Sequence, residues 1–442
     1  MPLRPHKTLK ALAVLLLAGW SATAAAQQPA SLGLEAQTDS EYAGELPGRR
    51  GVVLEFQSLA TRDDNIFIDN TRRQGDYLVQ QGVLLKLWDK TPRCSLILEY
   101  HPSGLLYRSA SGLDALNQDL SFEGGVQVRP HLLLRWSDNF TRASGLAQLV
   151  ANQDVAFLPA GPGPRLNVAL HAPLAQELGN QSSLDLVYEF SRRSSVDLSG
   201  SYEFADFTAA GAAAPALVSQ RSASAGLSYD YRLTRHVSVG ARYLFQRYHF
   251  RAGTQDDTHS AYLTGSWEIG PHLLLSLFGG PQYSLTDGLF AIPGSPGSSF
   301  LAVSSQGWEP AGGASLTFRS DRTVVSLTGQ RTVADGDGLL SSVTSWYGAA
   351  EVRRRITHAW DLVLTGSEAR SLALQGPFGF GEVNTQSAGL ALEHPLFGHL
   401  TLHAEYGYFR ERTNQNVAFT ANVDRNRYTL GVFYRTAVRR GQ

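Results

Sequence analysis

The chain has 442 residues and a near-balanced charge, with 38 basic and 39 acidic side chains and a formal net charge of −1. Without a basic excess it lacks the electrostatic signature of nucleic-acid binding, so we expect no nucleic-acid partner. The single cysteine, Cys94, excludes an internal disulfide framework. Beyond residue 26 there is no run of 18 apolar side chains, which excludes membrane-spanning helices.

The first 26 residues have the pattern of an export signal. Arg4, Lys7 and Lys10 precede a short apolar run at 11–20, and three alanines at 24–26 offer a cleavage site. We therefore expect residues 1–26 to be removed and the mature chain to work outside the cytoplasm. Residues 27–50 are polar and contain Pro and Gly, so we expect them to form a short periplasmic segment.

From residue 51 onward, side chains alternate between apolar and polar with a period of two, the pattern of β-strands. In residues 222–233, Leu227 and Tyr229 share one face of the predicted strand, and Asp230 and Arg232 share the other. We count about eighteen strands, with sixteen as the alternative, between residues 51 and 436. The first are predicted at 51–59, 77–88, 94–100, 116–128 and 132–139, and the last at 386–393, 400–410 and 426–435.

The connections between these strands alternate between short and long. Connection length that alternates with every second strand indicates successive hairpins. In a β-propeller the connection length would instead repeat with every four-stranded blade. The alternation predicts an even-numbered closed barrel with both termini in the periplasm and the long loops outside. The longest loop, 143–181, is a candidate for folding inward as a constriction; a surface loop, or an extra hairpin at 167–170, is the alternative. Short turns are expected at 89–93, 129–131, 192–194, 234–236, 270–272, 320–322, 357–359 and 395–399, and further long loops at 209–220, 286–306 and 376–382.

The two faces of the predicted strands differ as a membrane barrel requires. Apolar faces carry rings toward their ends, such as Trp267 and Trp346, which suit the lipid–water boundary. A lipid-facing Arg or Lys at mid-membrane costs ~2–4 kcal/mol, so the charged faces should line a wet lumen. Backbone groups in hydrocarbon need partners, so the sheet must close. We predict an all-β transmembrane antiparallel up-and-down β-barrel, lined by Glu203, Asp230, Arg232, Arg242, Glu351, Arg353, Arg355, Glu405 and Arg427.

Histidines and hydroxyls offer weaker hints of chemistry. His399 and His403 are spaced to share a metal on a helix, but on a strand they stand about 13 Å apart. We therefore expect no metal site and no cofactor. A hydrolase constellation can be drawn around Ser260, but the chain has no G-x-S-x-G elbow, so we expect no catalytic residues and no enzyme activity. The other members of that constellation are His249, His259, Asp256 and Asp257.

Residues 61–70, T-R-D-D-N-I-F-I-D-N, gather oxygen-bearing side chains around an Ile-Phe-Ile centre. A helix-loop-helix calcium loop needs a glycine and a distal glutamate at fixed spacing, and this stretch has neither. At the outer end of the first strand, these carboxylates would either cap backbone groups of the loop or share divalent cations bridging to lipopolysaccharide. We favour capping over bridging.

Residues 51–76, from G-V-V-L-E-F to R-R-Q-G-D, resemble the start of a bacterial family of outer-membrane β-barrel porins, several of them linked to exopolysaccharide gene clusters. In that family a strand runs into a D-D-N-hydrophobic segment and a polar loop that closes in an acidic residue. Beyond about 30 residues the likeness is one of hairpin architecture. Such barrels commonly end on an aromatic-terminated strand, whereas here residues 437–442 follow and are expected to form a periplasmic extension. The positions of the family-marker loop are Asp63, Asp64, Asn65, Asp69 and Asp76, with Ile66 as the hydrophobic residue.

These features predict a pore in the outer membrane of a Gram-negative cell that lets small polar solutes diffuse passively. A channel or accessory protein for exopolysaccharide export is the alternative, because Tyr248, Phe409 and Phe433 fall on the polar face, where rings suit sugars. A barrel-type hydrolase ranks third. The expected partners are outer-membrane lipid and lipopolysaccharide, the barrel-assembly machinery, and small polar solutes or oligosaccharide.

Overall fold

The computed structural model describes residues 50–67, 70–71, 73–144, 175–209, 219–251, 253–291, 300–336, 340–374, 381–414 and 422–440. Most of these residues belong to eighteen β-strands, and a short 3-10 turn, η1 (Ser111–Leu113), lies between the third and fourth. In these ranges no helix is long and apolar enough to cross a bilayer. The strands are β1(Arg50–Asp63), β2(Asp76–Lys90), β3(Cys94–Tyr107), β4(Ala115–Arg129), β5(Leu132–Ser144), β6(Ala175–Ser191), β7(Ser194–Ala209), β8(Gln220–Arg232), β9(Val237–Phe250), β10(Gln255–Ile269), β11(Leu273–Ala291), β12(Phe300–Arg319), β13(Thr323–Gly336), β14(Leu340–Arg355), β15(Asp361–Ala373), β16(Glu382–Phe397), β17(Leu400–Thr413) and β18(Asn422–Arg440).

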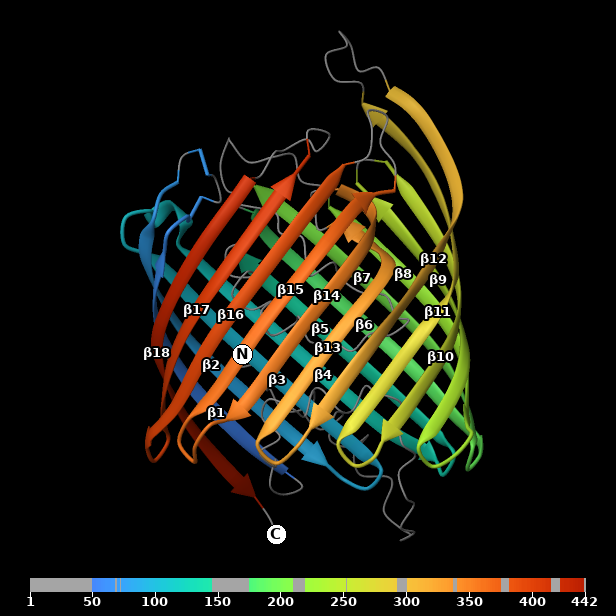
Figure 1. Cartoon of the computed structure of the whole chain (residues 1–442), viewed down its shortest axis with the longest axis horizontal. Helices are drawn as coiled ribbons and strands as arrows, with labels where there is room; N and C mark the ends of the chain where they lie inside the picture. The colour runs from blue at the N-terminus through green and yellow to red at the C-terminus, as the bar shows by residue number, and fades with distance from the viewer. Residues whose placement is uncertain are drawn as a thin grey trace, which may run out of the picture. The chain divides into compact units, whose positions relative to one another are not determined.

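The strands form one closed sheet. Each pairs antiparallel with the next along the chain, and β1 also pairs with β18. Arg50 lies opposite Arg440 and Asp63 lies opposite Arg427, so this seam runs the full length of β1. Figure 1 shows the strands inclined around the barrel wall. The predicted transmembrane barrel is confirmed, with eighteen strands and not sixteen.

The eight predicted short turns lie between consecutive strands at one end of the barrel, and the longer connections lie at the other end. The predicted loop 286–306 is wrong at both ends, because β11 runs to Ala291 and β12 starts at Phe300. These residues lack clear alternation, and cross-strand pairing supplies what the local pattern does not. Strand β18 continues to Arg440, so residues 437–440 of the expected extension pair with β1. The proposed constriction loop, 143–181, begins in β5 and ends in β6, and its residues 145–174, with the possible hairpin at 167–170, lie outside the described residues.

Alternation along each strand places apolar side chains outside and polar ones inside. On β10, Leu263 is outward and 73% exposed, whereas its inward neighbours Ser260 and Tyr262 are buried. Aromatic rings mark both ends of the outward apolar band, as in transmembrane barrels. Rings toward the long-loop end include Tyr77, Tyr243, Trp308, Trp346, Tyr406 and Tyr428; those toward the short-turn end include Tyr188, Phe190, Trp267, Phe318, Trp360 and Tyr434.

The wall parts between β12 and β13 toward the long-loop end. Strand β12 pairs with β11 over its whole length but with β13 only from Arg319 back to Gly312. Beyond that point β13 and β14 continue as a hairpin paired with each other. Val333 packs against Tyr248 and Phe250 of β9, although β9 is four strands away in the sheet order. The end of this hairpin, residues 332–336 and 340–345, therefore bends into the lumen; we call it the hairpin tip.

Candidate functional site: the lumen and its outer mouth

The nine lumen-lining residues predicted from the sequence lie on the inward face, in two groups. Glu203, Asp230, Arg232 and Arg242 belong to β7, β8 and β9, and their outward neighbours include Tyr202, Tyr229 and Tyr243. The other five belong to β14, β17 and β18. Arg353 lies 3.8 Å from Glu351, and Arg355 lies 3.5 Å from Asp361 near the short-turn end. The lining residues of this second group are Glu351, Arg353, Arg355, Glu405 and Arg427.

Three carboxylates on neighbouring strands form an acidic arc in the lumen wall. Asp185, Asp197 and Asp230 lie on β6, β7 and β8. Two guanidiniums flank them: Arg242 interacts electrostatically with all three, and Arg135 with Asp185 and Asp197. Arg242 Nη2 donates to Ser199 Oγ at 3.1 Å. The arc therefore holds one more negative than positive charge.

On the inward face of the remaining strands, most charges are paired. Arg435 of β18 donates to Glu55 of β1 through Nε at 2.6 Å, so this contact joins the last strand to the first. His403 lies between two carboxylates, with Nδ1 3.4 Å from Glu393 and Nε2 3.3 Å from Glu405. Lys86 and Glu99 form a further ion pair between β2 and β3. Paired charges give this part of the wall a polar surface with little net field.

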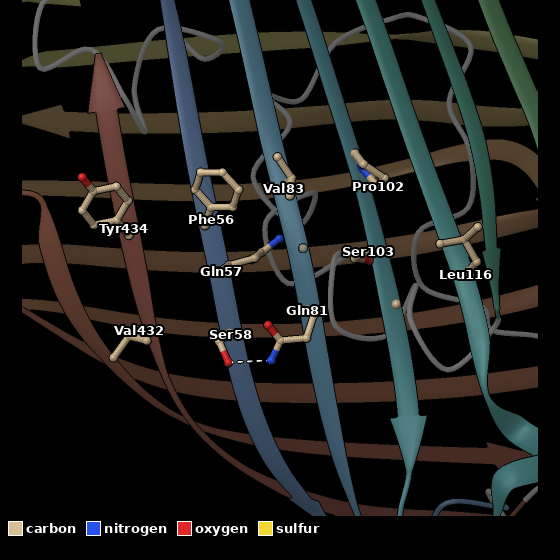
Figure 2. A pocket seen from close by; sticks show the side chains of 12 residues that line it. Phe56, Gln57, Ser58, Gln81, Val83, Pro102, Ser103, Leu116, Val432 and Tyr434 are labelled. Carbon is tan, nitrogen blue, oxygen red and sulfur yellow. Dashed lines mark hydrogen bonds between the residues drawn. The ribbon is translucent and has the colours of Figure 1, made fainter.

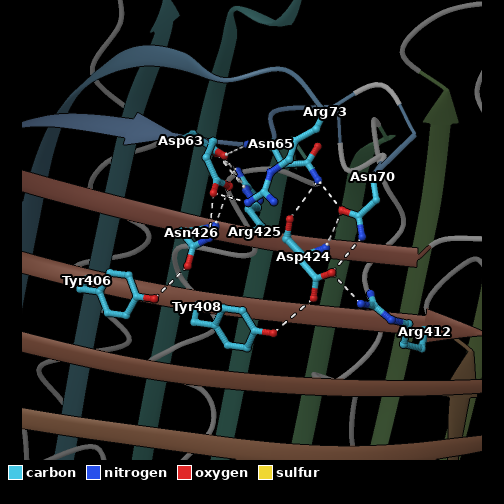
Figure 3. Close-up of polar contacts among 11 residues, drawn as sticks. Asp63, Asn65, Asn70, Arg73, Tyr406, Tyr408, Arg412, Asp424, Arg425 and Asn426 are labelled. Atoms are coloured by element: carbon cyan, nitrogen blue, oxygen red, sulfur yellow. Dashed lines mark hydrogen bonds and ion pairs between the residues drawn. The ribbon is translucent and has the colours of Figure 1, made fainter.

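A buried ion pair lies at the outer end of the seam (Figure 3). Arg425 Nε donates to both carboxylate oxygens of Asp63, at 3.1 and 2.9 Å, and its Nη2 contacts the same group. The side chains of Arg425 and Asp63 are 1% and 0% exposed. Arg427 Nε lies 3.9 Å from the same carboxylate. The pair joins β1 to β18 across 362 residues of sequence.

The other acids of the marker loop accept hydrogen bonds from backbone groups. Asp64 Oδ1 accepts from the Asn426 backbone N–H at 2.8 Å, and Asp63 Oδ1 accepts from that of Asn65 at 3.0 Å. Asp76 accepts from the backbone N–H groups of Tyr77, Ser109 and Ala110 at 2.8–3.0 Å. These contacts have the geometry of capping. Asp69 lies outside the described residues.

A second polar knot holds the loop from its far side (Figure 3). Asn70 Nδ2 donates to Asp424 Oδ2 at 2.9 Å, and Asn65 Nδ2 donates to the Asp424 carbonyl at 3.0 Å. The Asp424 carboxylate also accepts from Arg412 Nη2 at 2.6 Å and from the Tyr408 hydroxyl at 3.3 Å. Asn65 and Asn70 of the loop are thus both attached to β18.

These anchors place an apolar side chain inside the barrel mouth. Ile66 is completely buried among Leu78, Leu105, Tyr107 and Val423, which come from β2, β3 and β18. The D-D-N-I stretch therefore combines polar anchors with an apolar tip that packs on the lumen wall. The mouth is narrowed at this point by a connection near the start of the chain.

The hairpin tip narrows the mouth from another side. Ser342 and Val343 are fully buried, and Ser342 lies against Asp256 of β10, whose carboxyl group also contacts Thr286 of β11. At the fork where β12 and β13 part, Glu309 Oε2 accepts from Arg331 at 2.8 Å and from Thr344 Oγ1 at 2.9 Å. This carboxylate ties β12 to both strands of the hairpin, so the tip is anchored at its base and packed at its end.

The hydrolase constellation does not assemble. Ser260 faces the lumen, whereas His259 and Asp257 face outward because they occupy the other parity of the same strand. His259 Nδ1 contacts the Tyr243 hydroxyl at 2.7 Å, and Asp257 pairs with Arg247 at 2.7 Å. Within the described ranges no group of three potential metal ligands is found.

Several lumen residues escaped the sequence reasoning. Arg135 and Asp197 have the inward parity of their strands, so alternation alone was signal enough to find them. Arg425 has the same parity, but its partner Asp63 lies at the other end of the chain, and no local pattern indicates that pairing. Val333 occupies an outward parity and is buried because the hairpin bends.

Comparison with known proteins adds only the architecture. No family model and no curated protein matches the chain. Among solved structures, the chain is similar to OccK2 (OpdF) of Pseudomonas aeruginosa in complex with glucuronate, with 11% identity, 88% of this chain and 98% of that chain covered, and a TM-score of 0.45. It is also similar to OccAB3 of Acinetobacter baumannii, with 10% identity, 88% and 99% covered, and a TM-score of 0.42. At such low identity the likeness extends to the fold and no further.

Proposed function

We propose that the protein is a channel of the Gram-negative outer membrane through which small polar solutes diffuse passively. The observation that carries this proposal is the closed wall of eighteen strands with an inward face of charged and polar side chains. A barrel of about 16–18 strands is wide enough to enclose an aqueous channel. Outer-membrane lipid would contact the apolar band, lipopolysaccharide its outer rim, and the barrel-assembly machinery the chain during insertion. We propose no catalytic step.

The charges of the wall support weak selectivity. Rings of a single sign select ions, whereas this wall carries pairs such as Arg435–Glu55 and Lys86–Glu99. The acidic arc has three carboxylates against two guanidiniums, so the expected preference is a small one, for cations. The narrowed mouth, where Ile66 and the hairpin tip pack inward, favours small solutes.

Single-channel recording on refolded mature protein in a planar bilayer tests the pore. We expect steady ohmic steps whose reversal potential in a salt gradient lies slightly on the cation side. Replacing Asp185 and Asp230 with Asn should move the reversal potential toward zero or into the anion range. A protein that shows heat-modifiable barrel mobility but no conductance would be a closed barrel, and the proposal would be abandoned.

A second candidate is a conduit or accessory for exported polysaccharide. The resemblance of residues 51–76 supports it, as does one inward ring, Phe433, which lies 5.2 Å from the His403 ring. Two other inward rings are occupied in packing, since Tyr248 stacks on Phe250 and Phe409 packs against the Ile66 cluster. Added oligosaccharide should block the single-channel current if this candidate is right, and Phe433→Ala should relieve the block. A current indifferent to oligosaccharide speaks for simple diffusion.

A further inference from the structure

Polar side chains interrupt the middle of the outward apolar band on one side of the barrel. On β1–β6 they are Ser58, Gln81, Gln118, Asp138, Asn180 and Ser182. On β8–β18 the described outward positions between the aromatic ends are apolar or glycine, apart from Glu368 and Gln386, which lie beside the Trp346 rung near the long-loop end and contact each other at 3.2 Å. Examples from that side are Leu227, Ala241, Leu263, Leu277, Ala314, Leu327, Ala350, Leu364, Leu390, Ala404 and Leu430.

The first polar patch consists of Ser58 and Gln81 and lies in a hollow (Figure 2). Gln81 Nε2 donates to Ser58 Oγ at 2.7 Å. Outward apolar residues continue on both sides of this pair, with Phe56 toward the short-turn end and Val79 toward the long-loop end. The patch is therefore inside the apolar band. The hollow measures about 420 Å³, and its outward lining includes Val83, Pro102, Gly104, Leu116, Val432 and Tyr434.

Pro102 gives the hollow a second polar feature. The β2–β3 ladder runs from Leu78 to Gly82 and resumes at Leu85, and Pro102 lies in the gap. Proline has no N–H to donate, so the ladder loses a rung. In a hydrocarbon environment an unpaired backbone group is unfavourable, which favours covering this gap with protein.

The second polar patch consists of Asp138, Asn180 and Ser182. The Asp138 carboxylate accepts from Asn180 Nδ2 at 3.0 Å and from Ser182 Oγ at 2.5 Å. Outward apolar residues again continue on both sides, with Leu184 and Leu178 along β6. The described residues include no basic partner for this carboxylate among the ion pairs of the barrel. A carboxyl group therefore lies on the lipid side of the wall.

Lipid is a poor environment for both patches. A charged side chain on the lipid face of a membrane barrel is destabilising, and intramembrane ionisable groups are rare unless they serve a purpose. The Asp138 carboxyl has two neutral donors, Asn180 and Ser182, and neither is a cation. A protein surface that supplies further donors would remove this cost. The concentration of outward polar groups on β1–β6 marks the sector that such a surface would cover.

The depth of the two patches identifies the partner. Strands tilted by ~40° rise ~2.5 Å per residue along the strand and ~3 Å per step to the next strand. From Ser58 the register leads across the sheet through Gly104 to Leu116, then along β4 to Phe122, and across again to Asp138. Summing these rises places Ser58 and Asp138 at membrane depths that agree within ~5 Å. A second copy inserted in the same direction always presents its patches at these depths. It can then be related only by rotation about the membrane normal, which generates a ring.

We propose that the protein assembles into a closed ring in which the first patch of one copy meets the second patch of the next. The patches are centred four strands apart in an eighteen-stranded wall, which corresponds to about 80° around the barrel. Neighbours in rings of three and four lie about 60° and 90° apart, so a ring of this size places both patches in contacts. The Gln81 amide donates where the next copy's Asp138 accepts, and Phe140, next to Asp138 on the outward face, enters the hollow.

The mass of the particle in mild detergent and in lipid nanodiscs tests the ring. Native mass spectrometry should give three or four copies of the mature chain for the natural protein. The double variant Gln81→Leu/Asp138→Leu suits lipid better and should shift the particle to one copy while its heat-modifiable mobility is retained. As the matched control, Leu263→Ala lies outward on the apolar side and should leave the mass unchanged. A natural protein of one copy in both media, or a double variant that stays assembled, would overturn the proposal.

Cross-linking tests which surfaces meet. In a Cys94→Ser background, Val83→Cys and Phe140→Cys in one chain should form disulfides between copies under mild oxidation. Each single cysteine variant alone should form none, because a ring brings unlike surfaces together. Strong cross-linking of either single variant would indicate a two-fold contact in place of a ring and would contradict the arrangement.

Discussion

At the scale of single residues, the buried pair Asp63–Arg425 is the most consequential contact of the outer mouth. Both side chains are almost fully buried, and Asp63 also caps the Asn65 backbone N–H. Removing one member of a buried pair leaves the other charge uncompensated, which typically costs about 3–5 kcal/mol. The marker loop therefore depends on a residue that the resemblance does not include.

We predict that Asp63→Ala lowers the free energy of unfolding by about 3–5 kcal/mol, measured by urea titration of the detergent-folded barrel. The matched control is Asp89→Ala, which breaks an exposed pair with Arg50 at 2.9 Å and should cost at most about 1 kcal/mol. Asp63→Leu combined with Arg425→Leu should recover most of the loss, since no charge remains buried. Equal effects of Asp63→Ala and Asp89→Ala would show that the buried pair has no special role.

At the scale of elements, the hairpin tip is the clearest case of a segment that leaves its expected place. Its strands obey the alternation of the wall up to Arg331, where the ladder to β12 ends. Beyond this point Val333 is held by Tyr248 and Phe250. An apolar contact of this kind holds the tip only while the side chain remains uncharged.

We predict that Val333→Asp releases the tip and raises the single-channel conductance, because a buried unpaired carboxylate is expelled toward water. Val333→Ile is the control, since it keeps the apolar contact and should leave the conductance unchanged. The cost to stability should be smaller than that of Asp63→Ala, as the eight rungs between β12 and β13 remain. An unchanged current in Val333→Asp would mean that the tip does not limit the pore.

At the scale of the whole molecule, closure depends on the pairing of the first and last strands. The fourteen rungs of the seam extend from Asp63–Arg427 to Arg50–Arg440. The last four rungs use residues 437–440, which lie beyond the aromatic-ended part of β18. A barrel gains its stability in lipid from having no open edge, so these rungs should matter.

We predict that ending the chain after Thr436 lowers the temperature at which the folded barrel band is lost on a gel by several degrees. Residues 50–53 would lose their β18 partners, although they would keep those of β2. Ending the chain after Arg440 removes only residues 441–442 and should have no effect. If the two truncations behave alike, the extension of β18 contributes nothing to closure.

The sequence by itself determined where most strands lie, their number within two, the alternation of short and long connections, and the inward or outward parity of side chains wherever the alternation is clear. These follow from a period of two and from turn residues, which act over a few neighbours. Parity was enough to place Asp230, Arg353 and Arg427 on the inward face.

The tertiary structure alone decided which groups meet. Asp63 finds Arg425 because the barrel closes with a particular stagger, and closure is a property of all eighteen strands together. The same stagger brings Ser58 and Asp138 to similar depths, while the parting of β12 from β13 buries Val333 against the usual parity. Local alternation carries no information about stagger or bending, so these contacts could not be read from the chain.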